Sequence, residues 1–179
     1  MKNQNNGTII IFMGIPGSGK STLAELLVDK NPLFRIVSRD TIRDAMFRHC
    51  DYTVAEKNAA YKSVKIAASV ILKKQENVVL DGMCWSSYGA LEDIMTFAED
   101  NNSRTAVFYC SCSSEVAINR VELDALNGVH LAKDRNADLV RRVGKSFRDI
   151  PNFVTHLNSE LDPHGNIKII QTKINELLC

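Results

Sequence analysis

The chain has 179 residues, of which 45% are hydrophobic and 24% are charged, so one domain over residues 1–179 can bury a core without metal or disulfide staples. A net charge of +1 gives no general attraction for nucleic acid, which would need a local basic patch. Five cysteines without paired CxxC spacing indicate reduced thiols, and no apolar stretch reaches the roughly 18 residues of a membrane span. We therefore expect a cytoplasmic protein without membrane contact, and the oligomeric state stays open.

Short apolar runs alternate with longer helical patterns along the chain. The runs predict five strands, at Ile9–Met13, Phe34–Val37, Val78–Leu80, Thr105–Tyr109 and Ile167–Ile170. The longer patterns predict helices that start near Gly19 and Asp40 and others over Val54–Gln75, Ser87–Glu99, Ser113–Leu126, Asn136–Arg148 and Thr172–Cys179. Such alternation forms βαβ units, so we expect a parallel sheet with helices on both faces.

A GxxxxGK[ST] motif directly follows the first predicted strand. It consists of Gly14, Ile15, Pro16, Gly17, Ser18, Gly19, Lys20, Ser21 and Thr22. Its glycines allow positive φ, so that successive N–H groups point into one concavity that holds phosphates. Lys20 then reaches the β- and γ-phosphates, and Ser21 places its hydroxyl on Mg²⁺. The motif predicts an ATP- and Mg²⁺-binding P-loop in a three-layer α/β/α sandwich of the P-loop NTPase class, with strand order 2-3-1-4-5.

Two further polar clusters follow strands, and in a parallel sheet such clusters meet at one edge. After the second strand, Asp40 can accept the proton of an acceptor hydroxyl, and Arg43, one helical turn later, can hold an anion on the acceptor. After the third strand, Asp81 stands where a carboxylate would hold Mg²⁺ or orient the acceptor. The structural alternatives are a helix cap with a solvent-exposed ion pair, and an ordinary Asp-Gly turn.

A basic segment after the fourth strand is the expected lid, with its loop at residues 127–135. A cation that arrives with the substrates stabilises the charge of the transferred group. Arg120 and Arg135 flank this loop, and we expect Arg120 to bind the nucleotide and Arg135 to act in catalysis. Trp85 either stacks on a nucleobase or covers core, and the second is more common. The histidines show no metal-ligand spacing, and we expect no role for them.

In combination these motifs resemble a known family: the P-loop kinases related to the 5′-hydroxyl polynucleotide kinase of T-even bacteriophage, a branch that includes zeta-toxin-like and small-metabolite kinases. The resemblance rests on the segments 14–22, 38–43, 79–81 and, more loosely, 141–151. It implies Lys20 and Ser21 at the phosphates and metal, Asp40 as general base, Arg43 on the acceptor strand's phosphate, and a lid arginine on the donor phosphate. Two departures stand out: segment 82–88 has no arginine, and closely spaced basic residues do not follow Arg120.

The resulting hypothesis is a phosphotransferase that uses ATP and Mg²⁺ to phosphorylate an acceptor hydroxyl, with a nucleic-acid 5′ end as the first acceptor to test. A small-metabolite or nucleoside-type kinase uses the same catalytic parts, and the near-neutral charge mildly favours it. A hypothesis of another class is an ATP-binding switch or module without transfer chemistry. A GTPase is disfavoured, because the chain has neither a DxxG after a strand nor an NKxD.

Overall fold

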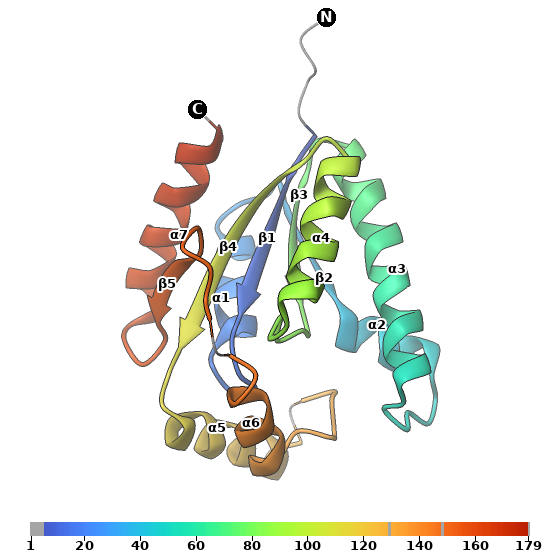
Figure 1. Cartoon of the computed structure of the whole chain (residues 1–179), viewed down its shortest axis with the longest axis vertical. Helices are drawn as coiled ribbons and strands as arrows, with labels where there is room; N and C mark the ends of the chain where they lie inside the picture. Colours follow the sequence, from blue (N-terminus) through green and yellow to red (C-terminus); the bar gives the residue numbers. More distant parts are fainter. Residues whose placement is uncertain (1–5, 129, 148, 179) are drawn as a thin grey trace, which may run out of the picture.

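A parallel sheet forms the centre of the fold (Figure 1). The computed structural model describes residues 6–128, 130–147 and 149–178, and within them the sheet has five strands in the order β2-β3-β1-β4-β5. The strands are β1 (Thr8–Met13), β2 (Phe34–Ser38), β3 (Asn77–Asp81), β4 (Arg104–Ser111) and β5 (Thr155–Asn158). Neighbouring strands all pair in parallel, so the predicted strand order is confirmed.

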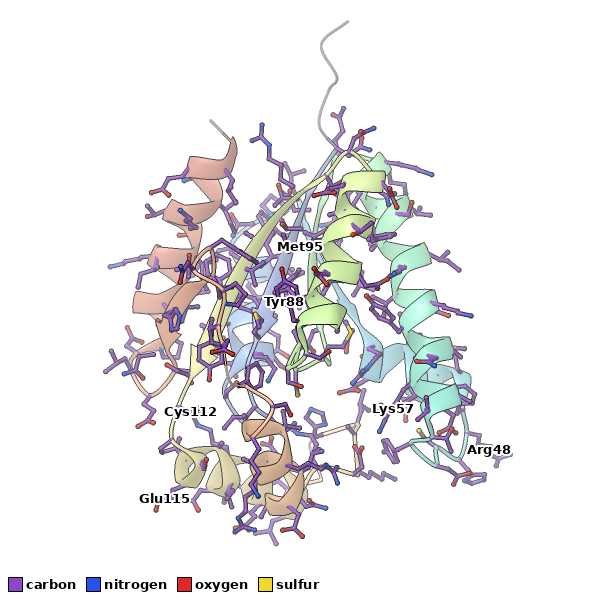
Figure 2. The ribbon with its side chains drawn as sticks, in the orientation of Figure 1. Arg48, Lys57, Tyr88, Met95, Cys112 and Glu115 are labelled. Carbon is purple, nitrogen blue, oxygen red and sulfur yellow. The ribbon has the colours of Figure 1, made fainter. Side chains whose placement is uncertain are left out.

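Helices cover both faces of the sheet, which confirms the three-layer architecture. On one face, α3 (Val54–Lys73) and α4 (Tyr88–Asp100) pack against the side chains of Ile9 and Ile11 in β1. On the other face, α1 (Lys20–Asp29) and α7 (Pro163–Leu178) pack against Ile10 and Phe12. Side chains fill the space between sheet and helices (Figure 2). Because successive side chains of β1 enter opposite cores, all of its residues from Ile9 to Met13 are apolar.

Three further helices lie toward the carboxyl ends of the strands (Figure 1). They are α2 (Arg39–Met46), α5 (Ser114–Leu126) and α6 (Ala137–Gly144). α2 continues directly from β2, and α5 and α6 share a small apolar cluster with Ile15 of the P-loop. This end of the sheet therefore carries the segments that the sequence singled out.

One predicted strand is wrong. The run Ile167–Ile170 belongs to α7, where Ile167, Ile170 and Ile174 are buried at helical spacing. The fifth strand is β5, whose sequence Thr-His-Leu-Asn buries only Leu157 because the strand lies at the edge of the sheet. A short apolar run fits a strand and a helix face equally well, and an edge strand needs no such run.

Most of the predicted helices are found, with shifts at their ends. α6 ends at Gly144 rather than continuing to residue 148, and the last helix begins at Pro163 rather than Thr172. Val129, Arg148 and Cys179, which belonged to the predicted loop and helices, lie outside the described residues. None of the helices in the described part of the chain is long and apolar enough to cross a membrane.

Candidate active site

The loop between β1 and α1 has the backbone of an anion cradle. Gly14, Gly17 and Gly19 have φ angles of 147°, 81° and 79°. Gly17 has no room for a side chain, because a Cβ there would lie 2.3 Å from the carbonyl oxygen of Ala117. α1 begins at Lys20, so the positive end of its dipole adjoins the loop. The P-loop geometry that the motif predicts is therefore formed in the folded chain.

Lys20 and Ser21, which follow these glycines, bond to the P-loop itself and to the end of β3, respectively. Lys20 Nζ donates hydrogen bonds to the carbonyl oxygens of Gly14 and Ile15, at 2.9 and 2.7 Å. The Ser21 hydroxyl donates to the Asp81 carboxylate at 2.8 Å. A hydroxyl and a carboxylate oxygen suit Mg²⁺, which takes its other ligands from water and phosphate. The fold thus brings together the two residues that the sequence assigned to a metal.

α2 begins with a buried ion pair. The Ser38 side chain caps the helix by accepting from the backbone N–H of Thr41, so Asp40 does not serve as the cap. Arg43 Nη2 lies 2.9 Å from Asp40 Oδ1, and the two side chains are only 4% and 13% exposed. The Arg43 guanidinium also lies over the ring of Tyr52, 4.6 Å from its centre. The alternative of a helix cap with a solvent-exposed pair is therefore wrong.

Asp40 lies in the first turn of α2, and Asp81 is the last residue of β3. The two residues can approach each other because Gly82, which follows Asp81, has no side chain. A Cβ at Gly82 would lie 2.8 Å from the Asp40 backbone nitrogen, and its φ of 77° disfavours other residues. Burial raises the pKa of Asp40 above its ordinary value, although Arg39 and Arg43 oppose the shift. A raised pKa makes the carboxylate a stronger base, which is the property required of a proton acceptor.

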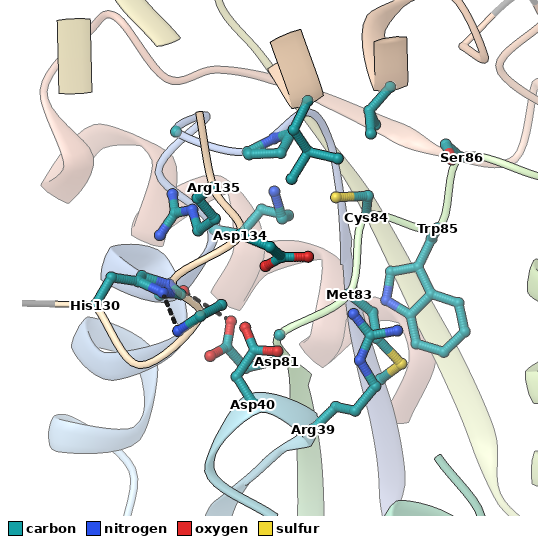
Figure 3. Close-up of a pocket in the computed structure, with 18 of the residues that line it drawn as sticks. Arg39, Asp40, Asp81, Met83, Cys84, Trp85, Ser86, His130, Asp134 and Arg135 are labelled. Carbon is teal, nitrogen blue, oxygen red and sulfur yellow. Dashed lines mark hydrogen bonds between the residues drawn. The ribbon is translucent and has the colours of Figure 1, made fainter. Parts of the chain in front are cut away.

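One cavity of about 620 Å³ joins these clusters at the carboxyl edge of the sheet (Figure 3). Its lining includes every residue that the sequence assigned to catalysis or metal: Lys20, Ser21, Asp40, Arg43, Asp81 and Arg135. Arg120 and most of the P-loop also line it, whereas Gly14, Ile15 and Ser18 do not. Ser18 is fully buried, and its backbone N–H donates to the Ile15 carbonyl, so these three residues support the loop from behind.

The two candidate lid arginines have different surroundings. Arg120 donates to the carbonyl oxygens of Gly17 and Ser159, at 3.2 and 3.0 Å. Arg135 Nη1 lies 3.6 Å from Asp124 Oδ2. Arg120 is thus fixed between the P-loop and the segment after β5, whereas a longer ion pair holds Arg135 at the cavity.

His130 is a lining residue that the sequence analysis missed. Figure 3 shows it beside Arg135 and close to Asp40. Its Nδ1 accepts a hydrogen bond from the backbone N–H of Ala132 at 2.9 Å, and burial, assisted by Arg135, lowers the pKa of His130. No spacing signal points to it, because the loop brings it to α2 only in the folded chain.

A second, smaller cavity of about 190 Å³ adjoins the P-loop. It shares Gly19, Thr22 and Arg120 with the main cavity, and Leu161 and Pro163 after β5 add apolar surface. A nucleotide whose phosphates lie in the P-loop can place its nucleoside here. The sequence analysis missed this cavity because the fifth strand was misplaced.

A protein-family model described as an AAA domain, AAA_33, matches residues 9–145. The chain belongs to the AAA_33 family. The match extends from β1 to the end of α6. It therefore contains the P-loop, the Asp40–Arg43 pair, Asp81 and both candidate lid arginines.

Relatives and solved structures agree with this family. The adenylate kinase of Prochlorococcus marinus strain AS9601 is 25% identical over 185 residues, which cover 95% of this chain and 98% of that protein. A protein of Chloroflexus aurantiacus J-10-fl, provisionally named a kinase, has a TM-score of 0.76 at 14% identity and covers 94% of this chain and 99% of its own. A chain of the Pnkp1/Rnl/Hen1 RNA repair complex has a TM-score of 0.63 at 20% identity, covering 84% of this chain and 50% of its own.

These findings confirm the resemblance to P-loop kinases at the level of the AAA_33 family and of the fold. The narrower resemblance to 5′-hydroxyl polynucleotide kinase stays a prediction.

Proposed function

We propose that this AAA_33 protein is an ATP-dependent phosphotransferase that moves the γ-phosphoryl group to an acceptor hydroxyl. The observation that carries the proposal is the buried Asp40–Arg43 pair, which shares one cavity with the P-loop. A P-loop alone serves switches as well as kinases, whereas a carboxylate of raised pKa in the same cavity supplies a base for an attacking hydroxyl.

At the donor end of the cavity, different residues bind different parts of MgATP. The P-loop amides and Lys20 hold the phosphates, and the nucleoside occupies the smaller cavity beside Arg120. Ser21 and Asp81 would hold Mg²⁺, which when bound neutralises charge on the phosphates. Arg135 adds a cation at the transferred group.

The transfer step uses Asp40 as the proton acceptor. The acceptor oxygen forms a bond to the γ-phosphorus while the bond from that phosphorus to the β–γ bridging oxygen breaks, and ADP leaves with its electron pair. The hydroxyl proton passes to the Asp40 carboxylate. Arg43 holds that carboxylate in place.

Two acceptor classes follow from the sequence. A nucleic-acid 5′ end is supported by the motifs around Asp40 and by the structural likeness to a chain of an RNA repair complex. A small-metabolite or nucleoside-type acceptor is supported by the relative named adenylate kinase and by the near-neutral charge of the chain. Both classes use the same base and the same P-loop.

The substitution Asp40→Ala tests the proposal. Loss of a general base lowers turnover by at least about 10²-fold, while calorimetry should find MgATP affinity nearly unchanged. Transfer is measured with γ-labelled ATP on 5′-hydroxyl oligonucleotides and on a panel of small hydroxyl compounds. Asp138→Ala, which removes an exposed aspartate of α6, is the control. Unchanged transfer by the Asp40→Ala variant would refute the role of base, and a protein that binds MgATP without any transfer would be a switch.

A further inference from the structure

One part of the main cavity, referred to below as this end, has an aromatic and cationic lining. It is formed by Arg39, Asn58, Tyr61, Met83, Trp85 and Ala90. Trp85 is 5% exposed and has a φ of 54°, a backbone conformation that a bulky residue rarely adopts. A strained backbone conformation of this kind persists only where the surrounding structure holds it, and it is common at binding sites.

Two N–H groups at this end have no partner. Within the part of the chain that the structure describes, Trp85 Nε1 and Arg39 Nε are buried without a hydrogen bond. Arg39 also forms none of the ion pairs found among the described residues, and burial lowers the pKa of its guanidinium. Asp40 and Asp134 oppose this shift from nearby without forming an ion pair with Arg39, so the guanidinium can accept an anionic group of a ligand as its direct partner. Figure 3 shows Arg39 extending toward Met83 and Trp85, on the side of Asp40 away from His130.

The aromatic wall is held rigidly from behind. Tyr61 meets Trp85 edge-on, with ring centres 6.2 Å apart and planes at 72°. The Tyr61 hydroxyl donates to Asp93 at 2.7 Å, and Lys65 pairs with the same carboxylate at 2.6 Å. A wall fixed in this way is preorganised for a ligand rather than adaptable.

The loop after α5 closes one side of this end. The Lys133 backbone N–H donates to the Tyr52 hydroxyl at 2.7 Å, and Lys57 at the start of α3 lies 3.9 Å from Asp134. A polynucleotide needs an open path with a row of cations for successive phosphates. This end instead offers one half-buried guanidinium that forms no ion pair among the described residues, and the contacts of the loop lie beside it, which suits a small acceptor.

We propose that this part of the cavity, the Arg39–Trp85 subsite, binds a small hydroxyl compound that carries one oxyanion, either a carboxylate or a phosphate. The oxyanion pairs with Arg39, Trp85 Nε1 donates to an acceptor oxygen, and the hydroxyl lies at Asp40. The inference rests on the proposed function and deepens it, because it names the acceptor class and disfavours a polynucleotide end.

Matched acceptors test the charge requirement. Transfer from γ-labelled ATP is measured on glycerate and glycerol 3-phosphate against glycerol, on 4-(hydroxymethyl)benzoate against its amide, and on a 5′-hydroxyl hexathymidylate. We expect kcat/KM for at least one anionic compound to exceed that of its neutral counterpart about tenfold or more, and the oligonucleotide to react no better than a neutral compound. The first two compounds distinguish a carboxylate from a phosphate.

Variants of the subsite separate binding from chemistry. Arg39→Gln should raise KM for the anionic acceptor about tenfold more than KM for its neutral counterpart, with the MgATP affinity unchanged. Arg35→Gln, which removes an exposed arginine paired with Glu76, is the control. Trp85 is the single tryptophan of the chain, so its fluorescence reports saturable binding of glycerate or glycerol 3-phosphate directly, without turnover.

Each outcome decides between the two proposals. Transfer that prefers the oligonucleotide, that ignores acceptor charge, or that is unaffected by Arg39→Gln overturns the subsite and leaves the phosphotransferase standing. Absence of transfer to every acceptor, the oligonucleotide included, overturns the proposed function and this inference with it.

Discussion

Replacement of Arg43 by methionine tests the buried ion pair at the centre of the site. The Arg43 side chain is 4% exposed, 2.9 Å from Asp40, and stacked on Tyr52. Methionine keeps a long, flexible side chain but removes the charge. The Asp40 carboxylate therefore loses its ion-pair partner while much of the packing is kept.

The expected cost follows from the burial of the pair. Removing one partner of a buried ion pair costs about 3–5 kcal/mol. Because the Asp40 side chain is still 13% exposed and Arg39 is nearby, we expect about 3 kcal/mol at neutral to basic pH. A matched pair exists on the surface: Asp138 and Arg141 have the same i,i+3 spacing but are exposed, so Arg141→Met should cost less than about 1 kcal/mol.

The loss of stability caused by Arg43→Met also depends on pH, and it should grow as the pH rises. Arg43 lowers the pKa of Asp40, so its removal raises this pKa further above the value in the unfolded chain. The folded variant then holds a proton that the unfolded chain releases, and its stability falls as pH rises through that interval. Urea unfolding should therefore show a larger loss at about pH 8 than at about pH 5. An equal loss at both values, or a loss no larger than that of Arg141→Met, would refute the buried pair.

Three further predictions concern the transfer reaction. Since burial raises the pKa of Asp40, the pH profile of kcat/KM should show an apparent pKa above the ordinary aspartate value of 3.8 on its acid side, with kcat/KM falling about tenfold per pH unit below it. An apparent pKa at or below 3.8 would contradict this. Ser21→Ala removes the hydroxyl that bonds to Asp81 and should raise the Mg²⁺ concentration for half-maximal rate about tenfold, which a magnesium titration measures. Gly82→Ala places a Cβ 2.8 Å from the Asp40 nitrogen and should lower kcat about tenfold or more with MgATP affinity kept, whereas Gly89→Ala, with open space around its Cβ, should have no effect.

The amino-acid sequence by itself determined the elements whose signal lies in consecutive residues. A fully buried strand such as β1 contains an apolar run, here Ile9 to Met13, and a P-loop needs glycines at set positions for positive φ. The edge strand β5 has neither signal, and the periodic apolar face of α7 was mistaken for it. Patterns along the chain therefore identified the core strands and the donor end of the site.

Only the tertiary structure decided how the side chains of the cavity are buried and paired, and which further residues join those that the sequence assigned to it. Asp40 could have been an exposed cap, and its burial beside Arg43 and Gly82 depends on how α2 packs against the end of β3. Arg39 and Trp85 come from segments after different strands, and His130 comes from a loop far along the chain. Burial, unpaired donors and shifted pKa values arise from neighbours in space, so no local pattern encodes them.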